Sequence, residues 1–450
     1  MSPIDQQAAI AEIARLATPL GGDDDGLDRL LDRVGGADVV MLGEATHGTA
    51  EFYEWRSRIT RRLVAEHGFG FVAVEGDWPD AAMIDRFVRG VVSGPEDAAD
   101  ARSLLGRLDR WPTWMWANEE VASLMDWMTN FNGLRASGAQ VRFHGLDMYS
   151  LYKSISAVLE YLADVDPELE AVARDRYACF DSHRPDEIEY ARSALRLPHG
   201  CESQAVANLM DLLALRLPAD RPDGRELFDA QQNARVVRDA DRYYRTMLRG
   251  DARSWNIRDT HMLETLDQLL LHGASSDGGA ARRGIVWAHN THVGDYRATD
   301  MVANGYINLG GLARERYGEA AVALVGFGTH GGSVIAAPAW DGPTTSMPVP
   351  PARPGSYEDA LHAARARVGA DDLLLVFDDL ARHGPLSRVA GHRAIGVVYD
   401  PAHEARGNYV PTALTDRYDA FIFIDRTEGL HPLPATADVR EMPETWPSGV

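Results

Sequence analysis

The chain has 450 residues, of which 45% are hydrophobic, so it is long enough for two or three average domains or for one large α/β unit with insertions. Its formal net charge is −22, from 45 basic and 67 acidic residues. This balance argues against a nucleic-acid partner and against binding to anionic membranes, because both kinds of binding depend on clustered Lys and Arg.

Cysteine content and hydropathy narrow the class of protein further. The two cysteines, Cys179 and Cys201, are too few for a disulfide framework or a cysteine-rich zinc site. The N-terminal segment lacks the apolar region of a secretory signal, and no stretch of about 18 uncharged apolar residues could form a membrane span. We therefore expect a cytoplasmic protein that does not enter a membrane, and the sequence leaves its oligomeric state open.

Short apolar runs predict a series of buried strands along the chain. Helical patterns separate most of these runs, which favours parallel crossover connections. We therefore predict an α/β fold with a mostly parallel sheet flanked by helices and a large helical insertion or lid. The strands are expected at residues 39–42, 71–74, 141–143, 285–287, 321–325, 373–377, 395–399 and 421–424.

The same patterns divide the chain into five regions. The stretch after the third strand is nearly all helical in pattern and lacks β-branched runs, which indicates an insertion rather than an independent domain. Gly-rich residues 273–279 and Pro-rich residues 343–354 are expected to be loops. The regions are a helical segment at 1–36, the first part of the α/β core at 37–150, the insertion at 151–280, the second part of the core at 281–430, and an irregular tail at 431–450.

A dense polar motif directly follows the first strand. Residues 43–48 read Gly-Glu-Ala-Thr-His-Gly, and a helix is predicted from residue 49 to residue 66. The motif places the carboxylate of Glu44 and the imidazole of His47 at a strand-to-helix turn, where open α/β sheets bind their ligands. Histidine is the side chain best suited to moving a proton near neutral pH. The motif therefore indicates either an acid/base site or a helix cap beside a structural histidine.

Polar side chains also follow four other predicted strands. If the sheet is mainly parallel, these strand ends meet at one edge, which is the usual ligand crevice of an open α/β sheet. Five polar strand ends together favour a shared site over five unrelated surface features. In chain order these side chains are Glu44, Glu75 with Asp77, His144 with Asp147, His289 with His292, and Thr329 with His330.

These residues fit two kinds of hydrolytic chemistry. In a metal-free site, His47 would take a proton from water and Glu44 would stabilise the imidazolium, while His289 or His292 would bind the developing oxyanion. In a metal-dependent site, histidines and carboxylates would ligate a divalent ion that lowers the pKa of bound water. Residues 289–292, His-Asn-Thr-His, differ from the His-Glu-x-x-His helix of zinc proteases. We therefore predict that no metal and no other cofactor is required.

Covalent catalysis by a serine or a cysteine fits the sequence poorly. The nucleophile elbow of serine esterases needs Gly-x-Ser-x-Gly between a strand and a helix, and the nearest segment, residues 331–335, lacks the final glycine. Both cysteines lie in the helical insertion and lack the flanking residues of a known nucleophile. A Rossmann fingerprint and a phosphate-binding Gly-Lys-Ser/Thr loop are also absent. Water is therefore the expected attacking group.

Three tryptophans and one arginine have both a structural and a functional interpretation. Arg56 lies at the border of an apolar helical stripe, where it could form a structural ion pair or contact the catalytic carboxylates or the substrate. Trp111, Trp114 and Trp116 could belong to the core or could line an apolar ligand pocket.

A charged pair in the insertion, Arg258 and Asp259, has a simpler interpretation. The two residues lie in a helical run, directly after Trp255, Asn256 and Ile257. We expect them to form an Arg–Asp bracket that ties the insertion to the sheet.

Five blocks of sequence together resemble the erythromycin esterase family. The resemblance runs from about residue 38 to residue 430 and rests on residues 43–56, 75–78, 112–116, 255–259 and 287–292. It implies an α/β core with helical additions, an active site in a deep cleft, and hydrolysis of a macrolactone ester by a water activated at His47. By the same resemblance its partners are Glu44, Arg56, Glu75, His289 and His292. Members of the family differ in metal dependence, and only some act in antibiotic resistance.

The leading hypothesis is therefore a carboxylic ester hydrolase acting on a small-molecule ester or macrolide. A metal-dependent hydrolase with a non-macrolide substrate and a non-catalytic small-molecule binding protein are the alternatives. Several polar strand ends favour an enzyme, because simple binding sites are mostly apolar. The expected catalytic residues are His47, Glu44, Glu75, His289, His292 and Arg56, and the expected substrate contacts are Asp77, Trp111, Trp114, Trp116, Asp147 and His330.

Overall fold

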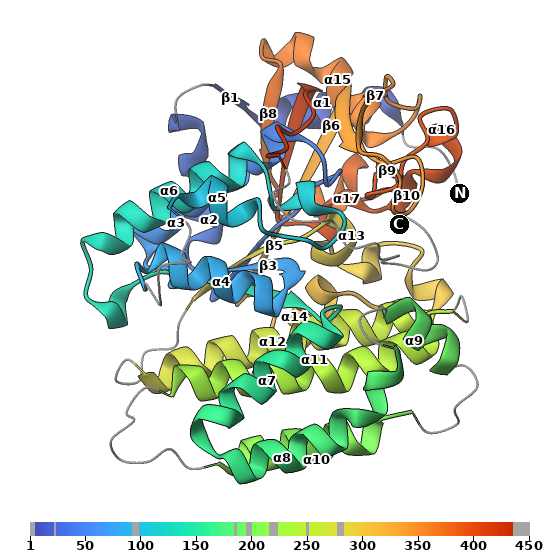
Figure 1. Ribbon diagram of the computed structural model, residues 1–450. Helices are drawn as coiled ribbons and strands as arrows, with labels where there is room; N and C mark the ends of the chain where they lie inside the picture. Colours follow the sequence, from blue (N-terminus) through green and yellow to red (C-terminus); the bar gives the residue numbers. More distant parts are fainter. Residues whose placement is uncertain are drawn as a thin grey trace.

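A nine-stranded mixed sheet forms the centre of the computed structural model, which describes residues 5–21, 24–91, 99–183, 187–194, 200–215, 224–248, 252–276 and 283–434 (Figure 1). A separate two-stranded sheet joins β9 and β10. The strands are β1 (Ala17–Leu20), β2 (Val39–Leu42), β3 (Phe71–Asp77), β4 (Arg142–Asp147), β5 (Gly284–Trp287), β6 (Val322–Ala336), β7 (Thr345–Val349), β8 (Asp372–Val376), β9 (Ala390–Arg393), β10 (Tyr409–Thr412) and β11 (Ala420–Thr427).

Six neighbouring strands of the large sheet run parallel. Their spatial order is β4-β3-β5-β2-β6-β11. β8 is antiparallel to β11, β1 is antiparallel to β8, and β7 pairs in antiparallel fashion with the last residues of β6. The carboxyl ends of β2, β3, β4 and β5 therefore lie at one edge of the sheet, as parallel pairing requires.

Helices cover both faces of this sheet. Successive residues of a strand point to opposite faces, so Val39 and Met41 join one apolar cluster and Val40 and Leu42 join the other. The helices are α1 (Gln6–Leu16), α2 (Asp28–Val34), α3 (Ala50–His67), α4 (Trp78–Val88), α5 (Ala101–Leu105), α6 (Glu119–Gly133), α7 (Leu151–Val165), α8 (Pro167–Tyr177), α9 (Glu187–Ala194), α10 (Glu202–Ala214), α11 (Arg225–Met247), α12 (Ala252–Ser276), α13 (Asn290–Val293), α14 (Leu309–Tyr317), α15 (Tyr357–Val368), α16 (Glu404–Gly407) and α17 (Leu414–Arg417).

The helices α7 to α12 form a group of their own between β4 and β5. They lie side by side below the sheet in the view of Figure 1, in green to yellow. A disulfide joins Cys179, after α8, to Cys201, before α10, with Cα atoms 6.1 Å apart. Two cysteines form no framework, but this single cross-link holds two parts of the insertion together.

The α/β fold class is confirmed, and seven of the eight expected strands are present with small shifts of their ends. The strand expected at residues 395–399 is wrong. Ile395 and Val398 make only isolated bridges, to Thr46 and Ala337, because a short apolar run can be buried without joining a ladder.

Three other expectations about local structure need correction. The Pro-rich segment expected as a loop contains β7, in which Pro348 sits on an edge strand and so interrupts no central ladder. The N-terminal region includes the edge strand β1 as well as helices. Helix α12 continues to Ser276, into the segment expected as a Gly-rich loop. Most of the expected C-terminal tail lies outside the described residues.

The helices of the described segments include no candidate membrane span. None of them combines the necessary length with the necessary apolar character.

Candidate active site

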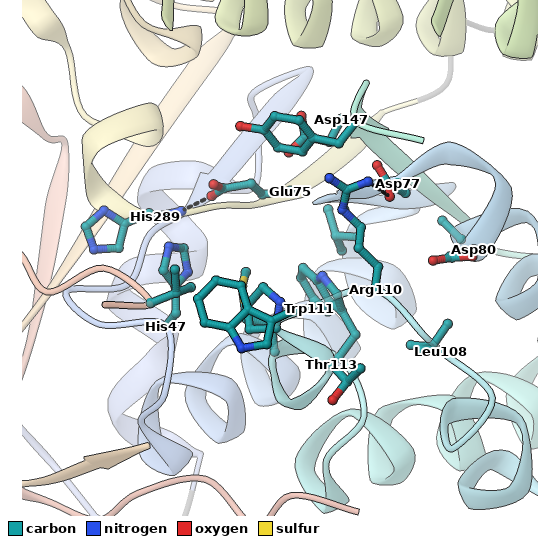
Figure 2. A pocket seen from close by; sticks show the side chains of 18 of the residues that line it. His47, Glu75, Asp77, Asp80, Leu108, Arg110, Trp111, Thr113, Asp147 and His289 are labelled. Carbon is teal, nitrogen blue, oxygen red and sulfur yellow. Dashed lines mark hydrogen bonds and ion pairs between the residues drawn. The ribbon is translucent and has the colours of Figure 1, made fainter. Parts of the chain in front are cut away.

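The carboxyl ends of β2, β3, β4 and β5 surround one cavity (Figure 2). Its volume is about 100 Å³. Its polar lining includes six of the residues expected from the sequence, namely His47, Glu75, Asp77, Asp147, His289 and His292. The structure therefore brings together side chains that are up to 245 positions apart, from His47 to His292.

The polar motif after β2 forms a fixed carboxylate–imidazole pair. Nδ1 of His47 lies 2.8 Å from Oε1 of Glu44, and both residues are buried. The turn packs closely against its neighbours. A Cβ atom on Gly43 would clash with Asn290, and a Cβ atom on Gly48 would clash with the backbone of Ile335. Since Glu44 holds Nδ1, the other ring nitrogen, Nε2, is the one available to a ligand of the cavity.

Arg56 lies behind this pair rather than in the cavity. Its Nη2 is 2.6 Å from Oε2 of Glu44, and its side chain is completely buried. The guanidinium carbon lies 4.2 Å from the ring centre of Tyr53 and 4.7 Å from that of Trp287, within cation–π distance. Both oxygens of Glu44 are thus fixed, one by Arg56 and one by His47. The structure supports the ion-pair interpretation of Arg56 and places it in contact with Glu44 of the carboxylate–imidazole pair.

His289 faces His47 across the polar end of the cavity. The two rings have centroids 4.8 Å apart. Nδ1 of His289 lies 2.8 Å from Oγ1 of Thr291 and accepts a hydrogen bond from the Thr291 amide. Nε2 makes no hydrogen bond of standard geometry among the described residues, although the ring also interacts with the backbone of Ala45. Burial, together with His47, holds the pKa of His289 well below its usual value, against the opposite effect of Glu75. His289 is therefore neutral near pH 7.

His292 lies between two carboxylates. Its Nδ1 is 2.9 Å from Oδ1 of Asp259, and its Nε2 is 3.3 Å from Oε1 of Glu75. Burial opposes the imidazolium, and so does Arg258, whose Nη1 lies 3.0 Å from Nε2. Asp259 and Glu75 outweigh both effects and raise the pKa of His292 to about 9. The indole of Trp255 stacks on its ring at 4.4 Å. His292 therefore carries a positive charge near neutral pH, with both ring nitrogens engaged.

Arg258 connects the helical insertion to two strand ends. From α12, its Nη2 lies 2.7 Å from Oε1 of Glu75 and 2.6 Å from Oδ2 of Asp147, and Nε is 3.1 Å from Oδ1 of Asp147. Despite the cost of burying a carboxylate, His292 and Arg258 hold the pKa of Glu75 well below its usual range. The amide of His289 also donates to Oε2 of Glu75, at 2.8 Å (Figure 2). The bracket expected at residues 258–259 is confirmed, and it forms one wall of the site.

The aromatic residues expected as substrate contacts divide into two groups. Trp111 and Trp116 line the cavity, and the Trp111 ring lies 5.2 Å from that of Trp340. Trp114 is not among the lining residues and belongs to the buried apolar cluster on the α3 and α6 side of the sheet. Beside Trp111, Nη1 of Arg110 lies 3.0 Å from Oδ2 of Asp77.

Two of the expected strand-end histidines lie outside the cavity lining. His330 lies within β6, which continues to Ala336, and its ring stacks on His362 with centroids 3.6 Å apart. His330 is therefore not at a strand end, contrary to the expectation. His144 stacks on Trp78 at 5.4 Å within β4.

Sequence reasoning missed several residues of the site, among them three on α12 and one that follows β4. Arg258, Asp259 and Trp255 enter it from α12, and Tyr149 lines the cavity beside Asp147. The Trp-Asn-Ile-Arg-Asp block, residues 255–259, was the available signal, since it joins an aromatic residue to a charged pair in an apolar helix.

The donor groups do not form a metal site in this structure. Across the described part of the chain, no three His, Cys, Asp or Glu side chains are arranged to hold one ion. Glu75 and Asp147 are both paired with Arg258, and Glu44 is paired with Arg56. A divalent ion would have to replace these guanidinium groups as the counter-charge, so the residues present do not fit the metal-dependent alternative.

Comparisons with known proteins place the chain in a family. The family described as erythromycin esterase matches residues 64–427. A succinoglycan biosynthesis protein of known structure is 21% identical and superposes with a TM-score of 0.73, covering 95% of this chain and 98% of that chain. A Bacillus cereus protein is 20% identical with a TM-score of 0.75, covering 96% of this chain and 100% of that one. A mutant of the erythromycin esterase EreC in its open conformation is 18% identical with a TM-score of 0.64, covering 91% and 96%. Because the family match spans most of its length, the chain belongs to the erythromycin esterase family.

Proposed function

We propose that this protein hydrolyses a carboxylic ester, or a lactone, with a water molecule activated by His47. The observation that carries the proposal is the His47–Glu44 pair, which lies at the polar end of a cavity with Nδ1 fixed at 2.8 Å from the carboxylate. Membership of the erythromycin esterase family supports ester hydrolysis as the reaction class.

The pair is suited to general base catalysis. Nε2 of His47 would take a proton from water as the oxygen attacks the ester carbonyl carbon, and Glu44 would stabilise the resulting imidazolium. His47 would then return this proton to the leaving alcohol as the tetrahedral intermediate breaks down. Arg56 would act as a positioning residue, because it binds the Glu44 oxygen that His47 does not use.

His289 is better placed than His292 to stabilise the oxyanion. Both ring nitrogens of His292 face charged partners, whereas Nε2 of His289 makes no hydrogen bond of standard geometry among the described residues. A neutral His289 whose Nδ1 accepts from the Thr291 amide carries its proton on Nε2. This N–H would donate to the developing oxyanion beside His47.

The helical insertion is proposed to act as one wall and lid of the site. Trp255 and Arg258, both on α12, line the cavity, so the insertion packs at the active edge of the sheet rather than at the opposite edge. Long segments that border a catalytic edge commonly control access to it.

The proposal is tested by incubating the protein with a panel of esters and macrolides and measuring a gain of one water by mass spectrometry. His47→Ala should lower turnover of any confirmed substrate by about 100-fold or more, because a positioned base is lost. His403 offers a matched control. It pairs with Asp400 at the same i, i+3 spacing, but its side chain is 73% exposed.

The control variant His403→Ala should retain wild-type turnover. Near-normal turnover by His47→Ala would show that His47 is not the base. Loss of activity on chelation, restored by a divalent ion, would favour the metal-dependent alternative, and binding without conversion of any panel member would favour a binding protein.

A further inference from the structure

We infer that the ester acted on here carries a compact, uncharged group on one side of the scissile bond, and that the apolar part of the cavity selects this group. The inference rests on the proposed function and adds the chemical class of the substrate. Three features of the cavity support it: the arrangement of its two ends, the pairing of its charges, and its size.

The cavity has a reactive end and a far end, where apolar side chains lie among paired charges. In Figure 2, His47 and His289 lie on one side, Leu108 and Asp80 on the other, and Trp111 lies between them. A substrate whose carbonyl carbon lies beside His47 would therefore extend one substituent past Trp111. The apolar side chains around the cavity are Val74, Ala81, Ile84, Leu108, Met115 and Phe143.

The charged groups of the cavity already have partners within the described residues. Arg110 pairs with Asp77 at 3.0 Å and Lys153 with Asp80 at 2.8 Å. Arg258 pairs with Asp147 at 2.6 Å. A charged substituent would have to displace one of these partners and leave another charge buried without compensation, which costs several kcal/mol. An uncharged apolar substituent gains by leaving water and disturbs none of these pairs.

The size of the cavity limits the substituent. Its volume of about 100 Å³ is below the range of ~300–1,000 Å³ usual for sites that enclose drug-sized ligands. Packed side chains form its walls, and closely packed interiors accept extra methylene groups only with strain. A short acyl or alkyl group therefore fits between these walls as they stand, whereas a large polyol ring would require the walls to move.

Two ester series test the inference. One varies the acyl chain as p-nitrophenyl acetate, butyrate, octanoate and dodecanoate, and the other varies the alcohol as methyl, butyl, octyl and dodecyl acetate. We expect kcat/KM to fall by about 10-fold or more either from the butyrate to the dodecanoate ester or from butyl acetate to dodecyl acetate. The reason is that one misfitting methylene group is worth about 10-fold or more in an apolar pocket. p-Nitrophenyl hydrogen succinate, which carries a charge, should be cleaved at least about 10-fold more slowly than the butyrate.

Adjacent alanines on α4 provide a matched pair of variants. Ala81 lines the cavity, whereas Ala82 lines a separate hollow between α4, α7 and α11. Ala81→Leu should shift the preference towards acetate esters, and Ala82→Leu should leave the profile unchanged. If Ala81→Leu fails to fold, Ile84→Ala replaces it, and the larger cavity should then shift the preference towards longer chains.

The outcomes separate the inference from the proposed function. Ester hydrolysis with a flat chain-length profile in both series, or with equal rates on the charged succinate, overturns the inference and leaves the proposed function standing. Rapid opening of macrolides without cleavage of the short esters would likewise overturn the inference and leave the proposed function standing. If no panel member gains water, the proposed function fails and the inference falls with it.

Discussion

His289 and His292 lie three residues apart on the same turn, both are buried, and their pKa values shift in opposite directions. The pKa of His289 is held well below its usual value, whereas that of His292 is raised to about 9. Burial disfavours the charged form of both rings. The difference comes from their partners, because His292 lies against Asp259 and Glu75, while His289 lies against His47 and Thr291.

This difference in charge suits the two histidines to different roles. A ring that is charged and bonded at both nitrogens is suited to holding carboxylates in place. A neutral ring with one nitrogen that makes no standard hydrogen bond is suited to contacting a substrate. The number of nearby carboxylates, and not the degree of burial, thus decides which of the two histidines is charged near neutral pH.

Removal of Arg258 should have the largest effect on this arrangement. Arg258→Gln leaves Glu75 and Asp147 without their guanidinium partner, and His292 becomes the main cation beside Glu75. We expect the free energy of unfolding to fall by about 3–5 kcal/mol, as for other broken buried pairs. Urea denaturation measures this change.

A surface arginine provides the control for this experiment. Arg174 pairs with Glu170, and its side chain is 62% exposed. Arg174→Gln should change the unfolding free energy by no more than about 1 kcal/mol. Equal effects of the two substitutions would show that the Arg258 network contributes no more than a surface pair.

Replacement of His289 should lower turnover without a comparable loss of stability. His289→Phe keeps a ring of similar shape but removes the Nε2 donor, so we expect turnover to fall by about 100- to 1,000-fold, as for the loss of an oxyanion donor. His289→Gln retains an N–H group and should lose less. Steady-state kinetics on the confirmed ester measure the turnover of both variants. Wild-type turnover in His289→Phe would show that His289 does not stabilise the oxyanion.

The raised pKa of His292 should make stability depend on pH. The folded protein binds this proton more tightly than the unfolded chain, so the stabilisation is complete below pH 6.5 and is lost as pH rises from 6.5 to about 9. We expect the wild-type unfolding free energy to decline across this window, and the decline to be smaller in His292→Gln. Denaturation curves at several pH values measure both slopes.

Asp259 gives a finer test of the same charge. Asp259→Asn removes one of the two carboxylates, and the pKa of His292 should fall by about 1–3 pH units. NMR titration of labelled histidines measures this change in the pKa of His292. An unchanged pKa would mean that Glu75 alone determines the charge of His292.

Sequence patterns predicted most of the fold and the first part of the site for local reasons. An apolar run followed at once by Gly-Glu-Ala-Thr-His-Gly marks both the end of β2 and the polar turn after it. The parallel sheet then brings the ends of β3 and β5 to the same edge, so Glu75 and His289 could be placed without knowing any side-chain contact.

The errors have a different origin, in tertiary structure that local patterns do not contain. His330 was expected at a strand end, but β6 continues beyond it because β7 and β11 extend the ladder. Trp114 points into the core while Trp111 lines the cavity, which depends on the path of an irregular segment. Asp259 joins the site only because α12 docks on the strand ends, and no spacing in the sequence specifies that docking.

The order of the strands has a consequence for how the protein is made. β5 lies between β2 and β3, yet it follows them in the chain only after the whole of α7 to α12. β2, which Glu44 follows, and β3, which contains Glu75, therefore have no ladder between them until β5 has left the ribosome. Because such non-local pairings form slowly and leave strand edges exposed meanwhile, the first third of the chain is the part most in need of protection from aggregation during synthesis.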